Sequence, residues 1–357
     1  MSTVAIVGAG YMGTVIATPL ADNGHAVRLV GTHLDGEIIR CCRERGHHPR
    51  LRRALPRGVE PYGVEDLAQA LEGAEVIVSG VNSLGVRWIG QALGPHLRPG
   101  QSVIAVTKGL EAAENGDLVI LPDVLRGELP AGIRDQIGLA AIGGPCIAGE
   151  LAGRRPTCVV FGSRDAGVAE RLAEVFRTSY YSVWTTTDLV GLEVCVALKN
   201  AYTLAVGMAD GLLERAGGCD EAGAYMHNLG AACFAQACTE MAHLLRITGG
   251  GRAFAYGLPG AGDLYVTCQR GRSYRLGVLL GSGHSFVEAR ALMPGETLEA
   301  AECVRAVGEA LPKLAARGLI DGGDLPLMRA LVDVIVRGRP AELPLGSFLR
   351  VQNRRAQ

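Results

Sequence analysis

A lysine stands inside an otherwise apolar stretch of the chain, "VALKNAYTLAVGMADGL" at residues 196–212. Lysine is rarely buried without a partner, because removing an ammonium group from water is strongly unfavourable. Lys199 therefore either extends its long stem to the surface or points into a site that uses its proton or its charge. Burial and a second cation nearby would bring a lysine pKa toward neutral pH, where an amine can both donate and accept a proton.

A second polar concentration, "AYGLPGAGDLYVTCQRGRSYRLG" at residues 255–277, combines glycines, one acid and several arginines. The glycines would bring the backbone close to a partner, and Asp263 stands directly before the apolar run "LYVTC". Arginine binds phosphate through two parallel hydrogen bonds, so clustered arginines beside small residues indicate an oxyanion or phosphate site as readily as a solvated loop. The residues concerned are Gly257, Gly260, Gly262, Arg270, Gly271, Arg272, Ser273 and Arg275.

The first 30 residues have the pattern of a dinucleotide-binding turn. The apolar run "TVAIV" precedes Gly8, Gly10 and Gly13, and a helical segment and a second strand-like run, "AVRLV", follow them. Gly8 would allow the tight turn, Gly10 would let backbone amides approach a pyrophosphate, and Gly13 would let the helix pack closely on the strand. The start of that helix would supply amide donors and a partial positive charge for the phosphates.

The end of the second strand leaves the identity of the dinucleotide open. An acidic residue there favours NAD, and an arginine favours NADP. Thr32 and His33 occupy that place, and Asp35 comes further along. NAD and NADP therefore both remain candidates.

Three more apolar runs, at residues 74–83, 101–111 and 137–150, predict buried parallel strands. Ligands of an open doubly wound sheet bind outside the carboxyl ends of its strands. Asn82, Lys108 and the turn Gly144-Pro145-Cys146 stand at those ends. We expect all three on the ligand side of the sheet.

From about residue 190 the pattern changes to long Ala- and Leu-rich segments at 188–213, 220–247, 286–316 and 325–338. With 357 residues the chain is too long for one compact core. The predicted fold class is α/β: an N-terminal Rossmann doubly wound sheet over residues 1–189, then an all-α substrate domain over 190–357, with the site in a cleft between them.

Bulk composition limits the partners and the compartment. A net charge of −1 and a pI of about 6.7 argue against nucleic acid and anionic membranes as partners. We expect no leader segment and no membrane-spanning helix, since the start enters a strand-like run and no uninterrupted apolar run is long enough. The ten cysteines read as reduced, core-filling thiols in the cytoplasm. No metal is predicted, because the cluster Cys41, Cys42, His47 and His48 has no zinc-site spacing.

Together these segments resemble the NAD(P)-dependent glycerol-3-phosphate dehydrogenase family over nearly the whole chain. The resemblance rests on "GAGYMGT", "VTKGLE", "GGPCIAGELAGRRPT", "ALKNAYTLAVGMADGL", "EM" at 240–241, "GLPGAGDLYVTC" and "GRSYRLG". The lysine and "GDL" blocks are more specific than the N-terminal glycines. The resemblance implies a Rossmann domain joined to a helical domain, often as a homodimer. It also implies interconversion of dihydroxyacetone phosphate and sn-glycerol 3-phosphate with NAD or NADP.

Carried over by position, the resemblance makes Lys199 the catalytic acid/base and places Lys108 at the substrate and the nicotinamide. Asp263 would contact the substrate or orient Lys199, and Arg272 would bind the phosphate. The implied cofactor contacts are Gly8, Gly10, Tyr11, Met12, Gly13, Thr32, Asn82, Lys108, Ala148, Arg272 and Glu296. The implied substrate contacts are Lys108, Gly144, Cys146, Lys199, Asn200, Asp263, Gly271, Arg272 and Ser273.

The chain departs from the family pattern at several of these positions. The phosphate loop reads Gly271-Arg272-Ser273 where the family has Ser-Arg-Asn, and Val81-Asn82-Ser83 replaces Val-Pro-Ser. The segment "HHPRLRRALP" lacks the usual Tyr-Leu-Pro-Gly pattern. The arginine that would recognise charge is kept, so another phosphorylated polyol or ketose is an alternative substrate. An opine-type dehydrogenase and a non-catalytic dinucleotide sensor are the other readings, and retention of Lys108, Lys199 and Asp263 argues against a sensor.

Overall fold

The computed structural model describes residues 1–348 and divides into two compact units. Unit 1 comprises Met1–Lys108 and Leu121–Leu192, and unit 2 comprises Gly109–Ile120 and the chain from Glu193 onward. The junction lies three residues from the predicted one at 189/190. The segment Gly109–Ile120, which the sequence analysis assigned to the first domain, belongs to unit 2 instead.

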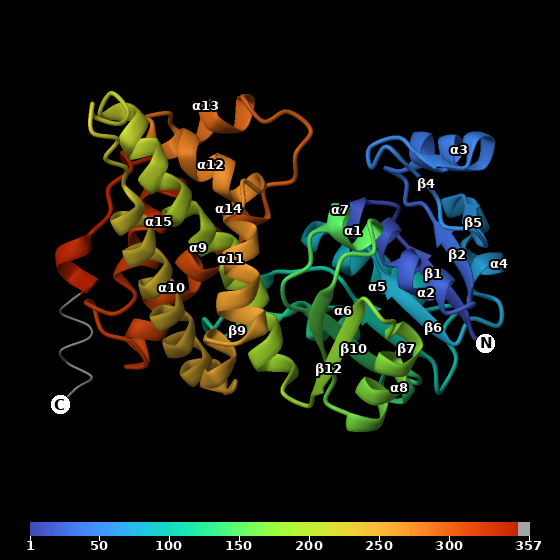
Figure 1. The fold of residues 1–357 in the computed structure, drawn as a ribbon. Helices are drawn as coiled ribbons and strands as arrows, with labels where there is room; N and C mark the ends of the chain where they lie inside the picture. Colours follow the sequence, from blue (N-terminus) through green and yellow to red (C-terminus); the bar gives the residue numbers. More distant parts are fainter. Residues whose placement is uncertain (349–357) are drawn as a thin grey trace. The chain divides into compact units, whose positions relative to one another are not determined.

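Unit 1 is built on one eight-stranded sheet in the order β12-β11-β10-β7-β6-β1-β2-β5 (Figure 1). All neighbouring strands are parallel except β10 and β11. β6 and β7 are buried along their whole length, as their continuous apolar sequences predict. The predicted doubly wound α/β sheet is confirmed. Its strands are β1 (Thr3–Val7), β2 (Ala26–Val30), β5 (Val59–Tyr62), β6 (Val76–Ser79), β7 (Ser102–Ala105), β10 (Gly138–Gly143), β11 (Thr157–Gly162) and β12 (Tyr181–Thr186).

Short helices connect these strands, and a small hairpin of β3 (His47–His48) and β4 (Arg53–Ala54) follows the third helix. The helices of unit 1 are α1 (Tyr11–Val15), α2 (Ala17–Asp22), α3 (Gly36–Arg45), α4 (Leu67–Leu71), α5 (Val86–Leu93), α6 (Leu121–Glu128), α7 (Ala148–Ala152) and α8 (Ala166–Phe176). The main core of the unit lies between sheet and helices and includes Ile6, Leu29, Val78 and Phe161.

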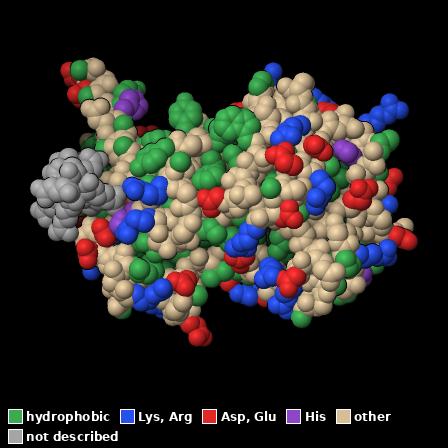
Figure 2. Space-filling view, turned by 90° about the horizontal axis from the view of Figure 1, so that it is seen from below, with side chains coloured by type: hydrophobic (Ala, Val, Ile, Leu, Met, Phe, Trp, Pro, Cys, Tyr) green, Lys and Arg blue, Asp and Glu red, His purple; other side chains and the backbone are tan. Residues whose placement is uncertain are grey.

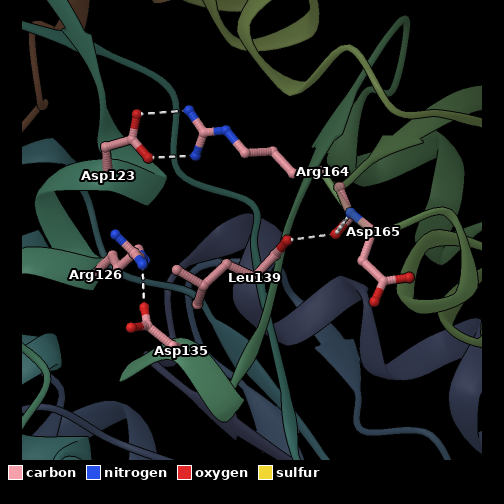
Figure 3. Close-up of polar contacts among 7 residues, drawn as sticks. Asp123, Arg126, Asp135, Leu139, Arg164 and Asp165 are labelled. Carbon is pink, nitrogen blue, oxygen red and sulfur yellow. Dashed lines mark hydrogen bonds and ion pairs between the residues drawn. The ribbon is translucent and has the colours of Figure 1, made fainter. Parts of the chain in front are cut away.

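Polar contacts fix the turn that follows β11 (Figure 3). The guanidinium group of Arg164 binds both carboxylate oxygens of Asp123 on α6, with Nη2–Oδ2 at 2.9 Å. Ser163 donates its hydroxyl to the carbonyl of Leu139 at 2.7 Å, and the Asp165 carboxylate caps the first amides of α8. The contact of Ser163 with Leu139 ties the end of β11 to β10, its antiparallel neighbour in the sheet.

Unit 2 is helical, with one added hairpin. Its helices are α9 (Leu189–Arg215), α10 (His227–Thr248), α11 (Asp263–Thr267), α12 (Arg272–Gly281), α13 (Phe286–Ala291), α14 (Glu299–Ala316) and α15 (Pro326–Ile335). The hairpin pairs β8 (Leu110–Ala112) with β9 (Leu118–Ile120), and Lys313 of α14 donates to the Ala113 carbonyl at 3.3 Å.

The predicted single strand over 101–111 is therefore wrong beyond residue 105, because the apolar pattern continues through the turn that separates β7 from β8. The predicted helix 286–316 is divided in two around Pro294 and Gly295.

Helix α9 is long and apolar enough to cross a membrane by length and composition alone, and 89% of its most apolar window is buried inside the structure. Its apolar side chains thus pack against protein, as in the central helix of a bundle. On the face shown in Figure 2, Lys and Arg side chains are interspersed with Asp and Glu. That distribution agrees with the near-zero net charge.

Candidate active site

Lys199 is buried and held by two side chains of α11. Its side chain is 8% exposed, and Nζ donates to Asp263 Oδ1 at 2.9 Å and to Thr267 Oγ1 at 2.6 Å. Asp263 and Thr267 are four residues apart and so lie on one face of α11. Thr267 in turn donates to the Asp263 carbonyl at 2.6 Å. The lysine is therefore not a surface residue: a carboxylate 64 positions later in the chain stabilises its ammonium form.

A tight π-helical turn at Leu258–Gly262 brings α11 into this position. A Cβ on Gly260 would lie 2.3 Å from the Ala255 carbonyl oxygen, so only glycine fits there. The sequence analysis expected this glycine-rich stretch to approach a partner. At Gly260 that partner is the backbone of its own segment.

The neighbouring thiol of Cys268 offers no competing proton carrier. Burial raises its pKa to about 12, while Thr203 and the charge of Lys199 act in the opposite direction. It therefore stays a neutral thiol at physiological pH.

Helices α9 and α12 cross at backbone contact through glycines on both. A Cβ added at any of four positions would lie 2.1–2.3 Å from a carbonyl oxygen of the other helix. The pairs are Gly207 with Tyr274, Gly211 with Val278, Gly277 with Leu204 and Gly281 with Met208. In these pairs a higher residue number on α9 goes with a higher residue number on α12, so the two helices run in the same direction. Lys199 and Arg272 precede the crossing on their respective helices and lie at the same end of it.

Arg272 is the exposed first residue of α12. Within residues 1–348 its guanidinium group makes no hydrogen bond or ion pair, which leaves it available to an anion. Gly271 is the N-cap of the helix, and Ser273, the next residue after Arg272, is half-buried. Of the arginines that crowd this loop, Arg275 is already paired with Glu296 at 2.9 Å.

Glu296 keeps one carboxylate oxygen unused. Oε1 accepts from Arg275, whereas Oε2 is buried and has no hydrogen-bond partner within the described part of the chain. A buried acceptor without a donor is costly, so this oxygen fits a donor from a bound molecule. The observation agrees with the cofactor role that the resemblance implies for Glu296.

In unit 1 the three glycines of the N-terminal turn have different surroundings. A Cβ on Gly8, at φ +115°, would meet Gly80 at 2.6 Å, and one on Gly13 would meet the Gly8 carbonyl oxygen at 2.1 Å. At Gly10 the nearest atom would be 4.0 Å away. Gly8 and Gly13 are thus required by the turn itself, while Gly10 faces open space, which fits a pyrophosphate next to its amide. Tyr11 and Met12 form the first turn of α1 beside it.

The segment after β2 folds back onto this turn. Asp35 Oδ2 accepts from Thr32 N at 2.9 Å, from Thr32 Oγ1 at 2.8 Å and from Ala9 N at 3.2 Å. The sequence analysis noted Asp35 only as lying further along the chain than the expected cofactor-selecting position. A β-turn from Thr32 to Asp35, in which the Asp35 N–H donates to the Thr32 carbonyl at 3.0 Å, brings the Asp35 carboxylate to the glycine turn.

The carboxyl ends of β6, β7 and β10 lie at one edge of the sheet, since these neighbouring strands are parallel. Asn82, Lys108 and Gly144 follow them, as predicted. Asn82 Oδ1 accepts from Gly85 N at 3.1 Å and caps a short 3₁₀ turn. Gly144 has φ +113°, and the turn it begins leads through the half-buried Cys146 to Ala148, the first residue of α7. In unit 2, Asn200 is buried next to Lys199.

Unit 1 is a Rossmann sheet with an open glycine turn, and unit 2 is helical and holds a buried lysine–aspartate pair. This combination is typical of the class of nicotinamide-dependent dehydrogenases. Comparison with known sequences identifies the family within that class. The profile for the NAD-dependent glycerol-3-phosphate dehydrogenase N-terminus matches residues 3–169, and the profile for its C-terminus matches residues 188–344. The chain belongs to the NAD-dependent glycerol-3-phosphate dehydrogenase family.

Individual relatives agree along most of the chain. The NADP(+)-dependent glycerol-3-phosphate dehydrogenase of Archaeoglobus fulgidus is 40% identical over 286 residues, which is 80% of this chain and 82% of the relative. Glycerol-3-phosphate dehydrogenase [NAD(P)+] of Bacillus velezensis is 31% identical over 352 residues, 98% of this chain and 94% of the relative. The crystal structure of glycerol-3-phosphate dehydrogenase from Coxiella burnetii superposes with a TM-score of 0.80 at 27% identity and covers 98% of both chains.

Proposed function

We propose that this chain interconverts sn-glycerol 3-phosphate and dihydroxyacetone phosphate by hydride transfer with NAD or NADP. The observation that carries the proposal is the buried contact of Lys199 with Asp263, in a chain whose relatives bear that activity in their names. A buried ion pair is weak evidence for stability alone, so its presence in an apolar helix favours a chemical role.

When bound, the reduced nicotinamide supplies the hydride that adds to the carbonyl carbon of the ketone. Lys199, held as an ammonium by Asp263, donates its proton to the oxygen that becomes an alkoxide, and its charge stabilises that oxygen as it forms. In the oxidising direction the neutral amine takes the proton from the hydroxyl. Asp263 and Thr267 keep Nζ in place in both directions.

The remaining residues bind and orient the substrate and the dinucleotide. Arg272 takes the phosphate of the substrate, with Gly271 and Ser273 on either side of it. Asn200, Gly144 and Cys146 contact the substrate, and Lys108 lies at substrate and nicotinamide. The dinucleotide is held by Gly8, Gly10, Tyr11, Met12, Gly13, Thr32, Asn82, Ala148 and Glu296.

The proposal extends to assembly and location. The resemblance supports a homodimer, and the reducing cytoplasm suits a chain whose ten cysteines are all free.

The test is absorbance at 340 nm with dihydroxyacetone phosphate and NADH or NADPH in separate cuvettes. Lys199→Ala should abolish turnover while dinucleotide binding persists. Arg272→Ala should chiefly raise KM for the phosphorylated substrate, with Arg290→Ala, an exposed arginine of α13, as the matched control. Normal turnover of Lys199→Ala, or an unchanged KM in Arg272→Ala, would contradict the assignment.

A second candidate is another phosphorylated polyol or ketose as substrate. It is favoured by Ser273, a shorter side chain than the asparagine of the family pattern, beside an unchanged Arg272. Dinucleotide binding without oxidation of NAD(P)H by dihydroxyacetone phosphate would move the search to those substrates.

A further inference from the structure

Ala9, the residue between Gly8 and Gly10, is held from outside the glycine turn at both of its backbone groups. Its N–H donates to Asp35 Oδ2 at 3.2 Å, and its carbonyl oxygen lies 2.9 Å from His48 Nε2. His48 is 1% exposed. The left-handed Gly46 ends α3, and the β3–β4 hairpin that follows carries this side chain to the turn.

The two contacts of the His48 ring define its protonation. Nδ1 accepts from the Leu51 amide at 3.1 Å, so Nδ1 carries no hydrogen. The partner of Nε2 is a carbonyl oxygen, so Nε2 carries the hydrogen and donates it. The ring is therefore neutral, with both nitrogens engaged by backbone groups. Burial, the largest effect, lowers the pKa of His48, and Arg50 adds to that, whereas the Ala9 carbonyl and Asp35 act in the opposite direction.

This arrangement has a direct effect on the neighbouring peptide. The Ala9 carbonyl and the Gly10 N–H belong to one planar trans peptide, so they point in opposite directions. A donor that holds the carbonyl on one side thereby aims the Gly10 amide to the other side. Without such a contact a glycine at this position would sample several backbone conformations. Asp35 fixes the preceding peptide in the same way, through the Ala9 N–H.

We propose that His48 is a positioning residue for the dinucleotide: it holds the Ala9 carbonyl and so presents the Gly10 amide to the pyrophosphate. The inference rests on the proposed function, because it names a residue that organises the same cofactor site. His48 belongs to the Cys/His cluster that the sequence analysis discounted as a metal site, and its ring nitrogens are used within the protein.

Two substitutions separate the contact with Ala9 from the contact with Leu51. His48→Gln places an amide nitrogen near the position of Nε2 and can still donate to the Ala9 carbonyl. His48→Asn keeps an oxygen near Nδ1 for the Leu51 amide but is too short to reach Ala9. A role limited to the local fold of the hairpin would be served better by asparagine, and the positioning role by glutamine.

The experiment is calorimetric titration of the 357-residue chain and both variants with NADH and with NADPH, together with steady-state kinetics and urea unfolding. We expect His48→Asn to weaken binding of the preferred dinucleotide about tenfold and His48→Gln to change it less than about threefold. The loss should appear in KM for the dinucleotide, with kcat at saturation nearly unchanged. Urea midpoints show whether each variant is folded at the assay temperature.

Wild-type affinity in His48→Asn, or equal losses in both folded variants, would overturn the inference. Binding of either dinucleotide without turnover of dihydroxyacetone phosphate would count against the proposed substrate, and the comparison of the two variants would still decide the role of His48. A wild-type chain that binds neither dinucleotide would refute both proposals.

Discussion

The glycine contact between α9 and α12 predicts a large effect from a single methyl group. In Gly277→Ala the new Cβ would lie 2.2 Å from the Leu204 carbonyl oxygen and 3.0 Å from its Cα. Both are backbone atoms of a buried helix, so no side chain can rotate away. Ordinary contact begins near 3.4 Å, and the two helices must therefore separate by about 1 Å.

The magnitude follows from two opposing effects. Inserting a methylene group into a packed core costs about 1–3 kcal/mol, and alanine gains about 1 kcal/mol over glycine in a helix. Separation of the helices also loosens the contacts at the other three glycines of the crossing. We therefore expect the free energy of unfolding of Gly277→Ala to fall by about 2 kcal/mol. Because Lys199 and Arg272 lie at the same end of this crossing, a shift of about 1 Å should also lower kcat/KM by about 100-fold.

Gly230→Ala in α10 is the matched control. Its Cβ would lie 3.9 Å from Val206 and 4.0 Å from Ala209, which is ordinary van der Waals contact. The same substitution should therefore stabilise the chain there, by up to about 1 kcal/mol. Urea unfolding of both variants, with equal m values, measures the difference. Gly277→Ala as stable as the wild type, or two equally destabilised variants, would refute the reasoning.

Three further predictions concern buried polar groups. Glu240→Ala removes a fully buried carboxylate that accepts four hydrogen bonds, two of them from the first amides of α15, and urea unfolding should show a loss of about 3 kcal/mol or more. Replacing either Lys199 or Asp263 by a neutral residue leaves the other charge buried and should lower the free energy of unfolding by about 3–5 kcal/mol. The double variant should lose clearly less than the sum of the two single losses. An additive result would argue against a paired site. Burial lowers the pKa of His48 in the folded chain, so the unfolded chain takes up the His48 proton first as the pH falls. The unfolding free energy should therefore fall as the pH drops below about 6.5. That fall should be smaller in His48→Gln, which is checked by comparing urea midpoints at pH 7.5 and about 5.

The parts of unit 1 that the sequence predicts are those with strong local patterns. The glycine turn and the fully buried β6 and β7 can be read from spacing and from unbroken apolar runs. The hairpin β8–β9 cannot, because each strand has three residues and its pairing with unit 2 depends on contacts such as that of Lys313 with Ala113. A segment this short carries too little periodicity to be separated from the strand before it.

The candidate site divides in the same way. The lysine and "GDL" blocks identify Lys199 and Asp263, and the sequence analysis offered Asp263 as a residue that orients Lys199, as the ion pair now shows. No local pattern, however, brings residues 64 positions apart together; that alternative came from what the motifs imply, not from periodicity or spacing. Asp35 and His48 have no motif of their own. Their importance comes from where Ala9 lies in the folded chain, and both reach it through turns whose geometry the sequence does not reveal.

The two units solve the same physical problem with different groups. In unit 2 a carboxylate and a hydroxyl fix the Lys199 ammonium before any substrate arrives, and in unit 1 His48 and Asp35 fix the peptides on either side of Ala9. Groups that are already in place need little reorganisation during reaction or binding. Arg272 differs, because it is exposed and, within residues 1–348, makes no polar side-chain contact. The Arg272 side chain becomes ordered only when the substrate binds, and it contributes equally to the ground state and the transition state. Removing Arg272 should therefore raise KM, whereas removing the preorganised Lys199 should lower kcat.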